Sequence, residues 1–569
     1  MLLERSCFVE KKIAILGGST TSEVKNILEL FLLNNGIMPI FYESEYNQYF
    51  EDALFGNNAL KEFQPDIFYI HTTVVNIINF PKSNDSIDDI NQLIADELSK
   101  YQSIWEALSK YNCAIIQNNF DLPITRTLGN LDCYSPLGKV NFVNKLNEGF
   151  SRFAQEIGNL YINDINYLSS YIGLKAWFDE PLWYLSKYAL SLEAIPELAF
   201  NLSHIINAIF GNSKKCLVLD LDNTCWGGII GDDGLSGIQI GTETAVAEAF
   251  TTFQQYAKNL KDRGVTLAVC SKNNFDNAKE GFDHPESILR FSDFVSFKAN
   301  WEPKHLNISE IAQEINISND SLVFIDDNPM EREIVSSQLP SVSVPDVGGD
   351  IAHFIKHIER NGYFEVVSLS EEDKKRNAYY KGNEKRLAEQ VKFTSYEEFL
   401  KSLGMKAIIK PFEDVYLDRI TQLSNKTNQF NLTTKRYTTG EITAISSDPD
   451  YITLYGKLVD KHGDNGLIAA SIGRIREKTC HIDLWLMSCR VLKRGMEQAM
   501  LDQFVTICKA RGLTEVVGYY FKTKKNEMVS NLYECLGFTL VESNSMKSVW
   551  KLDLDQYNAQ NIIIGIINE

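Results

Sequence analysis

The sequence predicts a protein of several α/β domains, and three observations support this fold class. The chain has 569 residues, which is too many for one hydrophobic core, so three or four domains are expected. Short apolar runs of strand length alternate with longer amphipathic segments, as in parallel sheets with crossover helices. Polar and acidic residues directly follow several of these runs, where parallel sheets bind ligands.

Composition and charge limit the possible functions. The formal net charge of -19 argues against general nucleic-acid binding, because neutralising phosphates requires clustered Lys and Arg. None of the ten cysteines forms a C-x-x-C pair, so neither a zinc site nor a disulfide framework is predicted. The first residues lack a signal-peptide pattern, and no apolar run is long enough to span a membrane. We therefore expect a cytoplasmic protein without nucleic-acid or membrane partners.

Residues 1–200 are expected to form the first α/β domain. A glycine-rich turn at 17–21 leads from the first strand into a helix that runs to about residue 35. Ser19 in this turn is either a nucleophile or, as we prefer, an N-cap. A hydrolytic serine needs a histidine base oriented by an acid, and the late segment 178–183 offers Asp179 without a histidine. The predicted strands are 12–16, 38–42, 66–71 and 113–117.

This first domain resembles a degenerate SGNH hydrolase. The resemblance implies an SGNH/flavodoxin-like fold. Because the histidine partner of a catalytic serine is missing from the late segment, we expect this domain to be non-catalytic.

Residues 201–368 carry the pattern with the clearest chemistry. Three apolar runs are expected to be strands, at 215–219, 265–270 and 321–325, with an amphipathic helix over 244–263 between the first two. Taken alone, the acidic pair after the first run could equally be a turn that caps a helix. In a parallel sheet, however, all the strand ends would meet at one edge. The first run is followed by Asp220 and Asp222, the second by Ser271, and the third by Asp326 and Asp327. Lys304 lies in the chain between Ser271 and Asp326.

These four motifs, in this order, resemble those of haloacid-dehalogenase-like (HAD) phosphotransferases. A phosphate ester is anionic, so an anionic nucleophile needs a cation beside it, and Mg²⁺ prefers carboxylate oxygens. Asp220 is the predicted nucleophile, which forms an aspartyl-phosphate. Asp222 is the predicted acid for the leaving oxygen and then the base for water. Ser271 and Lys304 are predicted to hold the phosphoryl oxygens.

The same motifs predict the metal ligands and further substrate contacts. The Mg²⁺ ligands are expected to be Asp220, the backbone carbonyl of Asp222 and Asp326, with Asp327 next to these ligands or bound to the ion through a water. Thr224 and Asn273 are predicted to bind substrate.

The spacing of the motifs predicts an uncapped site. The intervals from Thr224 to Ser271 and from Ser271 to Lys304 have room for crossover helices but not for a separate cap domain. An open site suits a phosphate on a bulky or protein-bound substrate, and small metabolites remain compatible with it. The sheet is expected to finish between 344 and 364, where turn residues cluster.

Residues 369–394 are expected to form a charged helical connector, and residues 395–569 a third α/β domain. A segment at 488–495 enters a predicted helix at 496–511. It resembles the pyrophosphate loop of GCN5-related N-acetyltransferases (GNAT), where backbone amides at a helix start hold phosphates. Lys493 replaces a glycine of that loop. The residues predicted to bind substrate here are Arg490, Gly495 and, before the segment 531–538 that resembles the late GNAT helix, Asn526.

Together the three regions resemble an FkbH-like protein of HAD subfamily IIIC, over about residues 12–552. Three departures from the family pattern are Cys225, Lys493 and Lys522. The segments that carry the resemblance are 219–224, 226–228, 271–274, 324–329, 428–434, 463–466 and 488–492.

The resemblance implies a function. Such proteins take glycerate from 1,3-bisphosphoglycerate, remove its remaining phosphate and deliver the glyceryl unit to the phosphopantetheine of an acyl carrier protein. Cys489 is the candidate for an enzyme thioester, because an arginine and a helix start favour its thiolate; the alternative is an inert buried cysteine. Two other functions stay open: a phosphatase, with or without another acyl transfer, that serves surface-polysaccharide or secondary-metabolite assembly, and a non-enzymatic docking scaffold.

Overall fold

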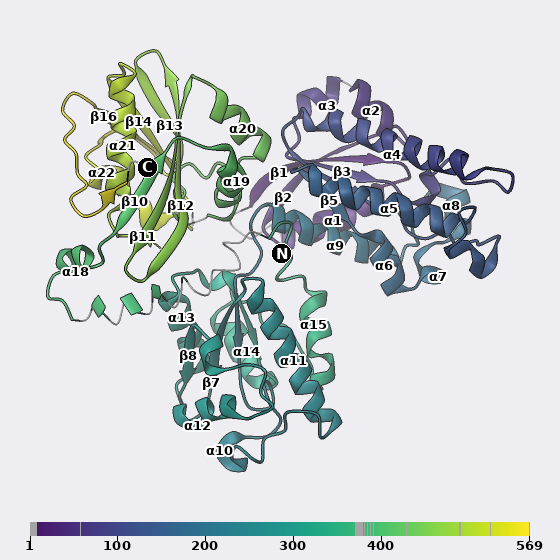
Figure 1. Cartoon of the computed structure of the whole chain (residues 1–569), viewed down its shortest axis with the longest axis horizontal. Helices are drawn as coiled ribbons and strands as arrows, with labels where there is room; N and C mark the ends of the chain where they lie inside the picture. Colours follow the sequence, from purple (N-terminus) through teal and green to yellow (C-terminus); the bar gives the residue numbers. More distant parts are fainter. Residues whose placement is uncertain are drawn as a thin grey trace. The chain divides into compact units, whose positions relative to one another are not determined.

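The structure is a computed structural model, and it confirms a multidomain α/β protein with three separate sheets (Figure 1). The chain divides into two compact units, Met1–Ile209 with Thr438–Glu441, and Phe210–Tyr437 with Ile442–Glu569. The residues that the structure describes are 8–56, 58–369, 379, 382–383, 385–386, 389–390, 392–427, 429–488, 491–523 and 525–567.

The first sheet is parallel throughout, with strand order β2-β1-β3-β4-β5. This is the order of flavodoxin-like sheets, as predicted. Helices α4 (Ile87–Ser109) and α5 (Lys139–Glu156) bury Trp105 and Phe150, whose rings meet edge to face at 5.0 Å. Four strands were predicted and β5 was not. The strands are β1 (Val9–Gly17), β2 (Ile37–Glu43), β3 (Ile67–His71), β4 (Ala114–Asn118) and β5 (Leu160–Asn163).

The boundary of the first unit lies slightly later than the sequence suggested. The boundary predicted at residue 200 would place most of helix α9 (Ala194–Ile209) in the second domain. The helix instead packs against α1 (Ser22–Asn34) within the first unit. Its buried face explains this, because a stripe of apolar side chains including Leu198 and Leu202 is fully covered there.

The second sheet is also parallel, with order β8-β7-β6-β9. The crossover from β6 to β7 contains α10 (Ile230–Asp233) and α11 (Ala245–Asp262), and that from β7 to β8 contains α12 (Phe275–Glu280) and short 3₁₀ turns. Within the described interval 216–299 no further domain is inserted, as the spacing predicted. The strands are β6 (Cys216–Leu219), β7 (Thr266–Ser271), β8 (Ser296–Ala299) and β9 (Leu322–Ile325).

The end of this second domain is helical. The isolated β-bridge between Val323 and Ser343 lies directly before the region 344–364 where the sheet was expected to finish, and no additional strand lies among those described residues. Helix α15 (Phe354–Arg360) instead buries Phe354 and Ile358 in the apolar core beneath the sheet. The turn residues Pro345 and Gly348, which suggested the end of the sheet, lie in the loop before α15.

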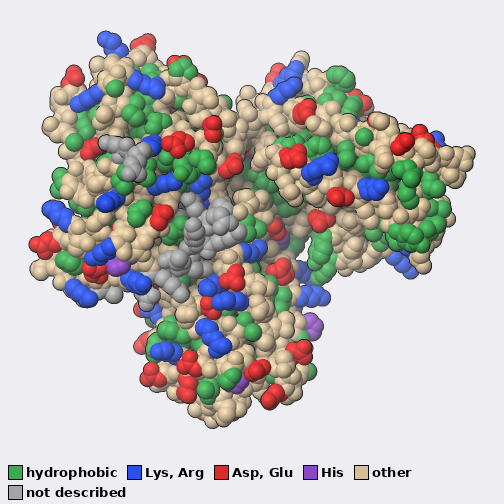
Figure 2. All heavy atoms as spheres, viewed as in Figure 1, with side chains coloured by type: hydrophobic (Ala, Val, Ile, Leu, Met, Phe, Trp, Pro, Cys, Tyr) green, Lys and Arg blue, Asp and Glu red, His purple; other side chains and the backbone are tan. Residues whose placement is uncertain are grey.

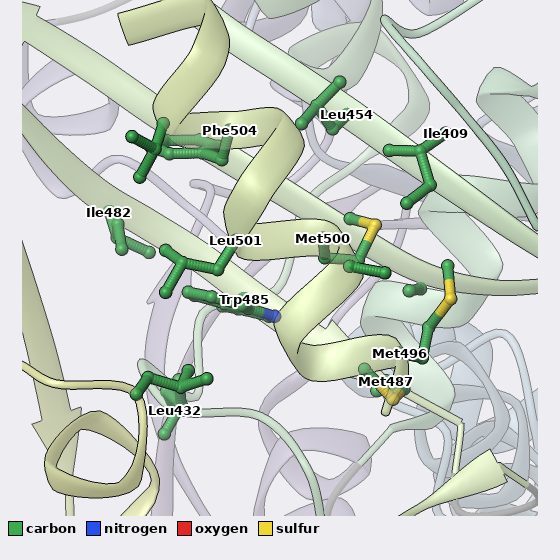
Figure 3. Close-up of a cluster of buried hydrophobic side chains, with 14 of the residues drawn as sticks. Ile409, Leu432, Leu454, Ile482, Trp485, Met487, Met496, Met500, Leu501 and Phe504 are labelled. Carbon is green, nitrogen blue, oxygen red and sulfur yellow. The ribbon is translucent and has the colours of Figure 1, made fainter. Parts of the chain in front are cut away.

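The third sheet is mixed, with order β15-β16-β14-β13-β12-β11-β10-β17. Its shortest strands are β10 (Lys406–Lys410), β15 (Thr539–Ser543) and β17 (Gly565–Ile566). Helix α21 (Met496–Ala510) packs Met500, Leu501 and Phe504 against its central strands (Figure 3). Strands β13 and β14 pair in parallel only between Thr479–His481 and 515–517, and diverge beyond that point. The longest strands are β11 (Tyr451–Asp460), β12 (Gly463–Arg476), β13 (Thr479–Met487), β14 (Glu515–Phe521) and β16 (Lys547–Asp553).

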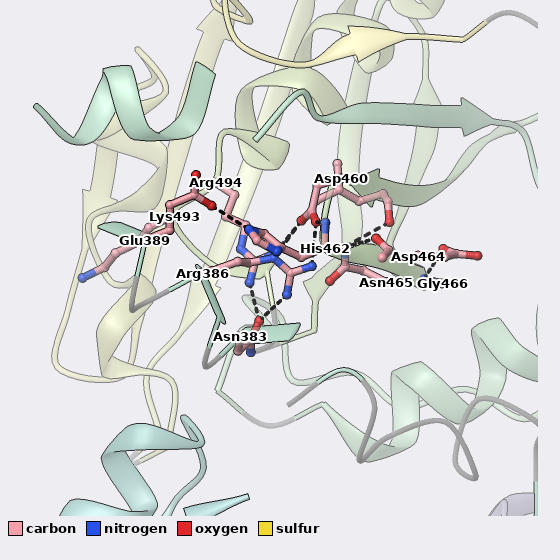
Figure 4. A network of polar contacts seen from close by, with 12 residues as sticks. Asn383, Arg386, Glu389, Asp460, His462, Asp464, Asn465, Gly466, Lys493 and Arg494 are labelled. Carbon is pink, nitrogen blue, oxygen red and sulfur yellow. Dashed lines mark hydrogen bonds and ion pairs between the residues drawn. The ribbon is translucent and has the colours of Figure 1, made fainter. Parts of the chain in front are cut away.

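The helix expected over the connector lies mostly outside the described residues, but two of its described side chains join a buried network (Figure 4). The Arg386 guanidinium donates to both oxygens of the Asp460 carboxylate, over 2.9 and 2.8 Å. Arg494 lies 3.4 Å from the same carboxylate, and Asn383 Oδ1 accepts from both arginines. Although burial opposes the charged form of Asp460, Arg386 outweighs burial and lowers the carboxyl pKa.

Surface features agree with the composition. Lys and Arg side chains are interspersed with Asp and Glu over the face shown in Figure 2. Among the described helices, none is both long and apolar enough to cross a membrane. The cysteines that the structure describes are free thiols.

Candidate functional site

The carboxyl ends of the second sheet bring the predicted catalytic residues together. Because β6 pairs in register with both β7 and β9, their last residues lie at one edge of the sheet. The residues at this edge are Asp220 after β6, Ser271 at the end of β7, Lys304 at the start of α13 (Lys304–Glu314), and Asp326 and Asp327 after β9.

Lys304 joins two of these carboxylates. Its Nζ lies 2.9 Å from Asp220 Oδ1 and 2.6 Å from Asp326 Oδ2. All three side chains are buried, with Lys304 only 4% exposed and Asp326 fully covered. Burial alone would lower the pKa of Lys304, but Asp220 and Asp326 outweigh it and raise this pKa, so the lysine stays charged.

The carboxylates carry more negative charge than one lysine balances. Ligand oxygens of Asp220, Asp326 and Asp327 lie within 4.8 Å of one another. Burial first, and Asp220 second, raise the pKa of Asp326 to about 6 and also raise the pKa of Asp327. This crowding of hard oxygen ligands fits a divalent cation such as Mg²⁺, which would relieve the repulsion.

Asp222 lies apart from that group of three carboxylates, and its side chain has different partners. Its Oδ1 accepts from the Trp226 indole N–H over 2.9 Å and from the Ile230 backbone N–H over 3.1 Å. Its Oδ2 accepts from the Asn273 amide over 2.9 Å. Burial is the main cause that raises the pKa of Asp222. The side chain that sequence assigned to substrate binding, Asn273, therefore contacts the predicted acid.

Hydrogen bonds with Thr224 and Arg332 hold the loop after β9 in place. Thr224, predicted to bind substrate, is fully buried, and its hydroxyl accepts from the Asp327 backbone N–H over 3.2 Å. Arg332, which the sequence reasoning missed, donates from Nη1 to the backbone carbonyls of Asp326 and Asp327, both over 2.8 Å. A basic residue five positions after the Asp-Asp pair was the available signal.

The residues predicted in the third domain are only partly described. Cys489 and Arg490 lie outside the described residues. Gly495 is the N-cap of α21 with φ of +87°, a left-handed conformation that suits glycine. A cavity of about 440 Å³ adjoins this helix start and is lined by Tyr396, Lys493, Gly495, Gln498, Cys535 and Ile563, among others.

Two polar groups in this region are used internally. The Glu497 carboxylate accepts from the Lys493 backbone N–H over 3.1 Å, and burial raises the Glu497 pKa. Asn526, predicted to bind substrate, is buried and donates to the carbonyls of Asn431 and Phe521 over 3.0 and 2.9 Å. Its side chain thus ties the end of β14 to a neighbouring loop.

Ser19 in the first domain is buried, and no hydrogen-bond partner of its Oγ is found in the described structure. The preferred N-cap role is wrong, because α1 begins after Thr21. His71 lies on the neighbouring strand, but its Nδ1 contacts the Tyr69 hydroxyl at 2.9 Å and the Asn118 amide at 3.2 Å. Burial lowers the His71 pKa to about 4. Neither histidine nitrogen contacts Ser19, so the geometry supplies no base for a nucleophile.

Comparisons with known proteins agree with this architecture. A family model, the N-terminal domain of FkbH, matches residues 12–207. No curated protein matches the chain. A solved structure, the N-terminal part of protein BF1531 from Bacteroides fragilis containing a phosphatase domain in complex with Mg, is 33% identical, with a TM-score of 0.60. It covers 64% of this chain and 96% of its own.

Acetyltransferases also match, at lower similarity. The ribosomal-protein-S18-alanine N-acetyltransferase from Escherichia coli is 12% identical, with a TM-score of 0.22, and covers 27% of this chain and 96% of its own. The PaiA N-acetyltransferase from Thermoplasma acidophilum, in complex with coenzyme A, is 14% identical, with a TM-score of 0.21. It covers 26% of this chain and 99% of its own. The B. fragilis match, together with the FkbH N-terminal model, settles the relationship that the sequence motifs indicated: the chain belongs to the FkbH family.

Proposed function

We propose that this protein is a Mg²⁺-dependent HAD-type phosphatase whose activity is coupled to acyl transfer. The observation that carries the proposal is the group of three carboxylates and one lysine at the carboxyl edge of the second sheet. Buried charges destabilise a fold unless they are paired or bind a ligand, and one lysine balances only part of the charge of three carboxylates. That cost argues against a non-enzymatic scaffold.

The residues of this edge supply a two-step reaction. A carboxylate oxygen of Asp220 attacks phosphorus, the ester P–O bond breaks, and Asp222 gives its proton to the leaving oxygen. Asp222 then takes a proton from water, whose oxygen bonds to phosphorus as the aspartyl-phosphate P–O bond breaks. When bound, Mg²⁺ supplies positive charge that offsets the repulsion between the Asp220 carboxylate and the phosphate ester. Lys304 holds Asp220 in place and adds positive charge beside the phosphoryl oxygens.

The acyl step is the finer part of the proposal. Its donor is 1,3-bisphosphoglycerate, and its acceptor is the phosphopantetheine of an acyl carrier protein, with Cys489 as the site of an enzyme thioester. Two features support this assignment. The phosphatase edge is uncapped, so it admits a phosphate on a large carrier, and the cavity beside α21 has the size of a small-molecule site.

Intact-protein mass spectrometry tests both parts. The full-length protein is incubated with 1,3-bisphosphoglycerate, Mg²⁺ and a phosphopantetheinylated carrier protein, and a glyceryl adduct is expected on the carrier. Asp220→Asn should leave the adduct heavier by one phosphate group, because acyl transfer proceeds while dephosphorylation stops. Cys489→Ala should abolish the covalent acyl adduct on the enzyme itself and retain phosphatase activity.

A second candidate is a phosphatase without this acyl transfer. One observation favours it: the buried Glu497 carboxylate already occupies the Lys493 backbone amide at the start of α21, where an anionic ligand would bind. The same experiment separates the two functions. Hydrolysis of phosphate esters with no mass shift on any carrier would support the second.

A further inference from the structure

The predicted acid Asp222 is held by three donors from separate segments. Two of them, the Trp226 indole N–H and the Ile230 backbone N–H, share Oδ1, over 2.9 and 3.1 Å. The third, the Asn273 amide that follows β7, binds Oδ2 over 2.9 Å. A carboxylate oxygen has two acceptor positions. Oδ1 is therefore saturated, and Oδ2 keeps one position for a proton.

Trp226 is fixed firmly enough to orient the carboxylate. Its side chain is fully buried and meets the Phe282 ring edge to face at 5.2 Å. A side chain on Gly281 would come within 2.6 Å of the indole, so the ring is closely packed on that side too. The backbones of Asp222 and Trp226 also form a β-bridge. The indole N–H therefore has little freedom to leave Oδ1.

A purely structural explanation is that a buried indole N–H simply needs an acceptor. It accounts for the Trp226 bond but not for the Asn273 bond, because Asn273 reaches the other oxygen from a different strand end. Together with the Ile230 bond, these two bonds leave one open position on the carboxylate, and it is on Oδ2.

We infer that Trp226 and Asn273 are positioning residues that orient Asp222 so that Oδ2 carries the proton given to the leaving group. The inference rests on the proposed phosphatase function and extends it to one oxygen atom of Asp222 and to the two side chains that orient it. General acid catalysis requires the proton within hydrogen-bond reach of the leaving oxygen. A carboxylate that rotates freely would meet this requirement only part of the time.

The test compares two leaving groups. An alkyl phosphate such as glycerol 2-phosphate releases a strongly basic alkoxide that needs the proton, whereas p-nitrophenyl phosphate releases a stable anion that does not. The ratio of their kcat/KM values measures how much protonation of the leaving group by Asp222 contributes, because kcat/KM covers the steps up to release of the first product. Trp226→Phe keeps an aromatic ring and removes the N–H together with one ring of the indole.

We expect Trp226→Phe to lower kcat/KM for glycerol 2-phosphate by roughly 10- to 100-fold and that for p-nitrophenyl phosphate by less than about threefold. Asp222→Asn should show the same selectivity with a larger loss. Trp177→Phe is the matched control, since it removes an equally buried indole N–H from a carboxylate outside the site, that of Asp121 in the first unit, and the ratio should stay near the wild-type value.

Equal losses for both substrates, or none, would overturn the inference. If Trp226→Phe fails to fold, Asn273→Ala probes the other oxygen and should change the ratio in the same direction. A wild-type protein that hydrolyses neither ester with Mg²⁺ would contradict the proposed phosphatase function itself, which separates the two failures.

Discussion

The first and second sheets share a topology but differ in the charge at their carboxyl edges. Both are parallel, and in both the strand order reverses beside the first strand of the sheet, β1 or β6. At the edge of the first sheet, Ser19, His71 and Asn118 are neutral, and the Glu43 carboxylate that ends β2 is paired with Lys25. The edge of the second carries Asp220 and Lys304 with two more carboxylates. The fold supplies the location of a site, and the residues at the strand ends decide its chemistry.

The largest effect expected from this contrast follows removal of the nucleophile. Asp220→Asn should lower p-nitrophenyl phosphate hydrolysis by on the order of 10³-fold or more, because the amide cannot form the covalent intermediate. Ser19→Ala, the matching change at the first sheet, should keep the rate within about twofold. A comparable loss with Ser19→Ala, or near-normal hydrolysis with Asp220→Asn, would reverse the assignment of roles to the two edges.

Removal of the buried lysine should affect both catalysis and stability. Lys304→Met leaves Asp220 and Asp326 without their shared cation, and we expect a loss of about 3–5 kcal/mol in the free energy of unfolding. Hydrolysis should fall by roughly 100-fold. Urea unfolding of the full chain, with and without Mg²⁺, measures the first effect.

The Mg²⁺ dependence is the informative part of that measurement. Saturating Mg²⁺ should restore part of the lost stability in Lys304→Met, because the cation offsets the same repulsion. Identical losses in the presence and absence of Mg²⁺ would mean that the carboxylates do not form a cation site.

The smallest effect concerns the neutral edge. Burial holds the pKa of His71 at about 4 in the folded state, against about 6.5 when unfolded. As the pH falls from 6.5 towards 4, the unfolded chain binds a proton that the folded chain does not, so this group lowers stability in acid. Between pH 7 and pH 5 the His71 contribution should be about 2 kcal/mol.

His71→Gln should remove this acid sensitivity. Hydrogen exchange of the peptide that contains β3, measured in the full chain at pH 7 and pH 5, gives the opening free energy in wild type and variant. On going from pH 7 to pH 5, the opening free energy of the wild type should fall by about 2 kcal/mol more than that of the variant. A difference that is independent of pH would show that His71 is accessible to protons in the folded state.

The sequence revealed the parts of the fold that are local. A continuous apolar run followed by a polar residue marks β1, β3, β6, β7 and β9, and each was predicted within a few residues. Strands β14 and β16 were missed, although alternate residues of each are buried in the pattern of a half-buried strand. β15 was missed because all of its residues are exposed.

The site was predictable to the same degree. Asp220, Lys304 and Asp326 converge as expected because each follows or begins an element at one edge of a parallel sheet. The contact between Asn273 and Asp222 depends on side-chain reach between neighbouring strand ends, which the spacing of residues along the chain does not encode. The two bonds from Arg332 to backbone carbonyls are likewise a tertiary feature.

The ion network of Arg386 has a practical consequence for dividing the protein. Asp460 is fully covered, and two of the contacts that stabilise its charge come from the Arg386 guanidinium, which lies before the first helix of the third domain. A fragment that starts after Arg386 would keep the acid and lose its main counter-charge, which costs several kcal/mol in a buried position. Expression of the C-terminal domain alone should therefore start upstream of Asn383, even though a boundary near residue 394 looks natural in the sequence.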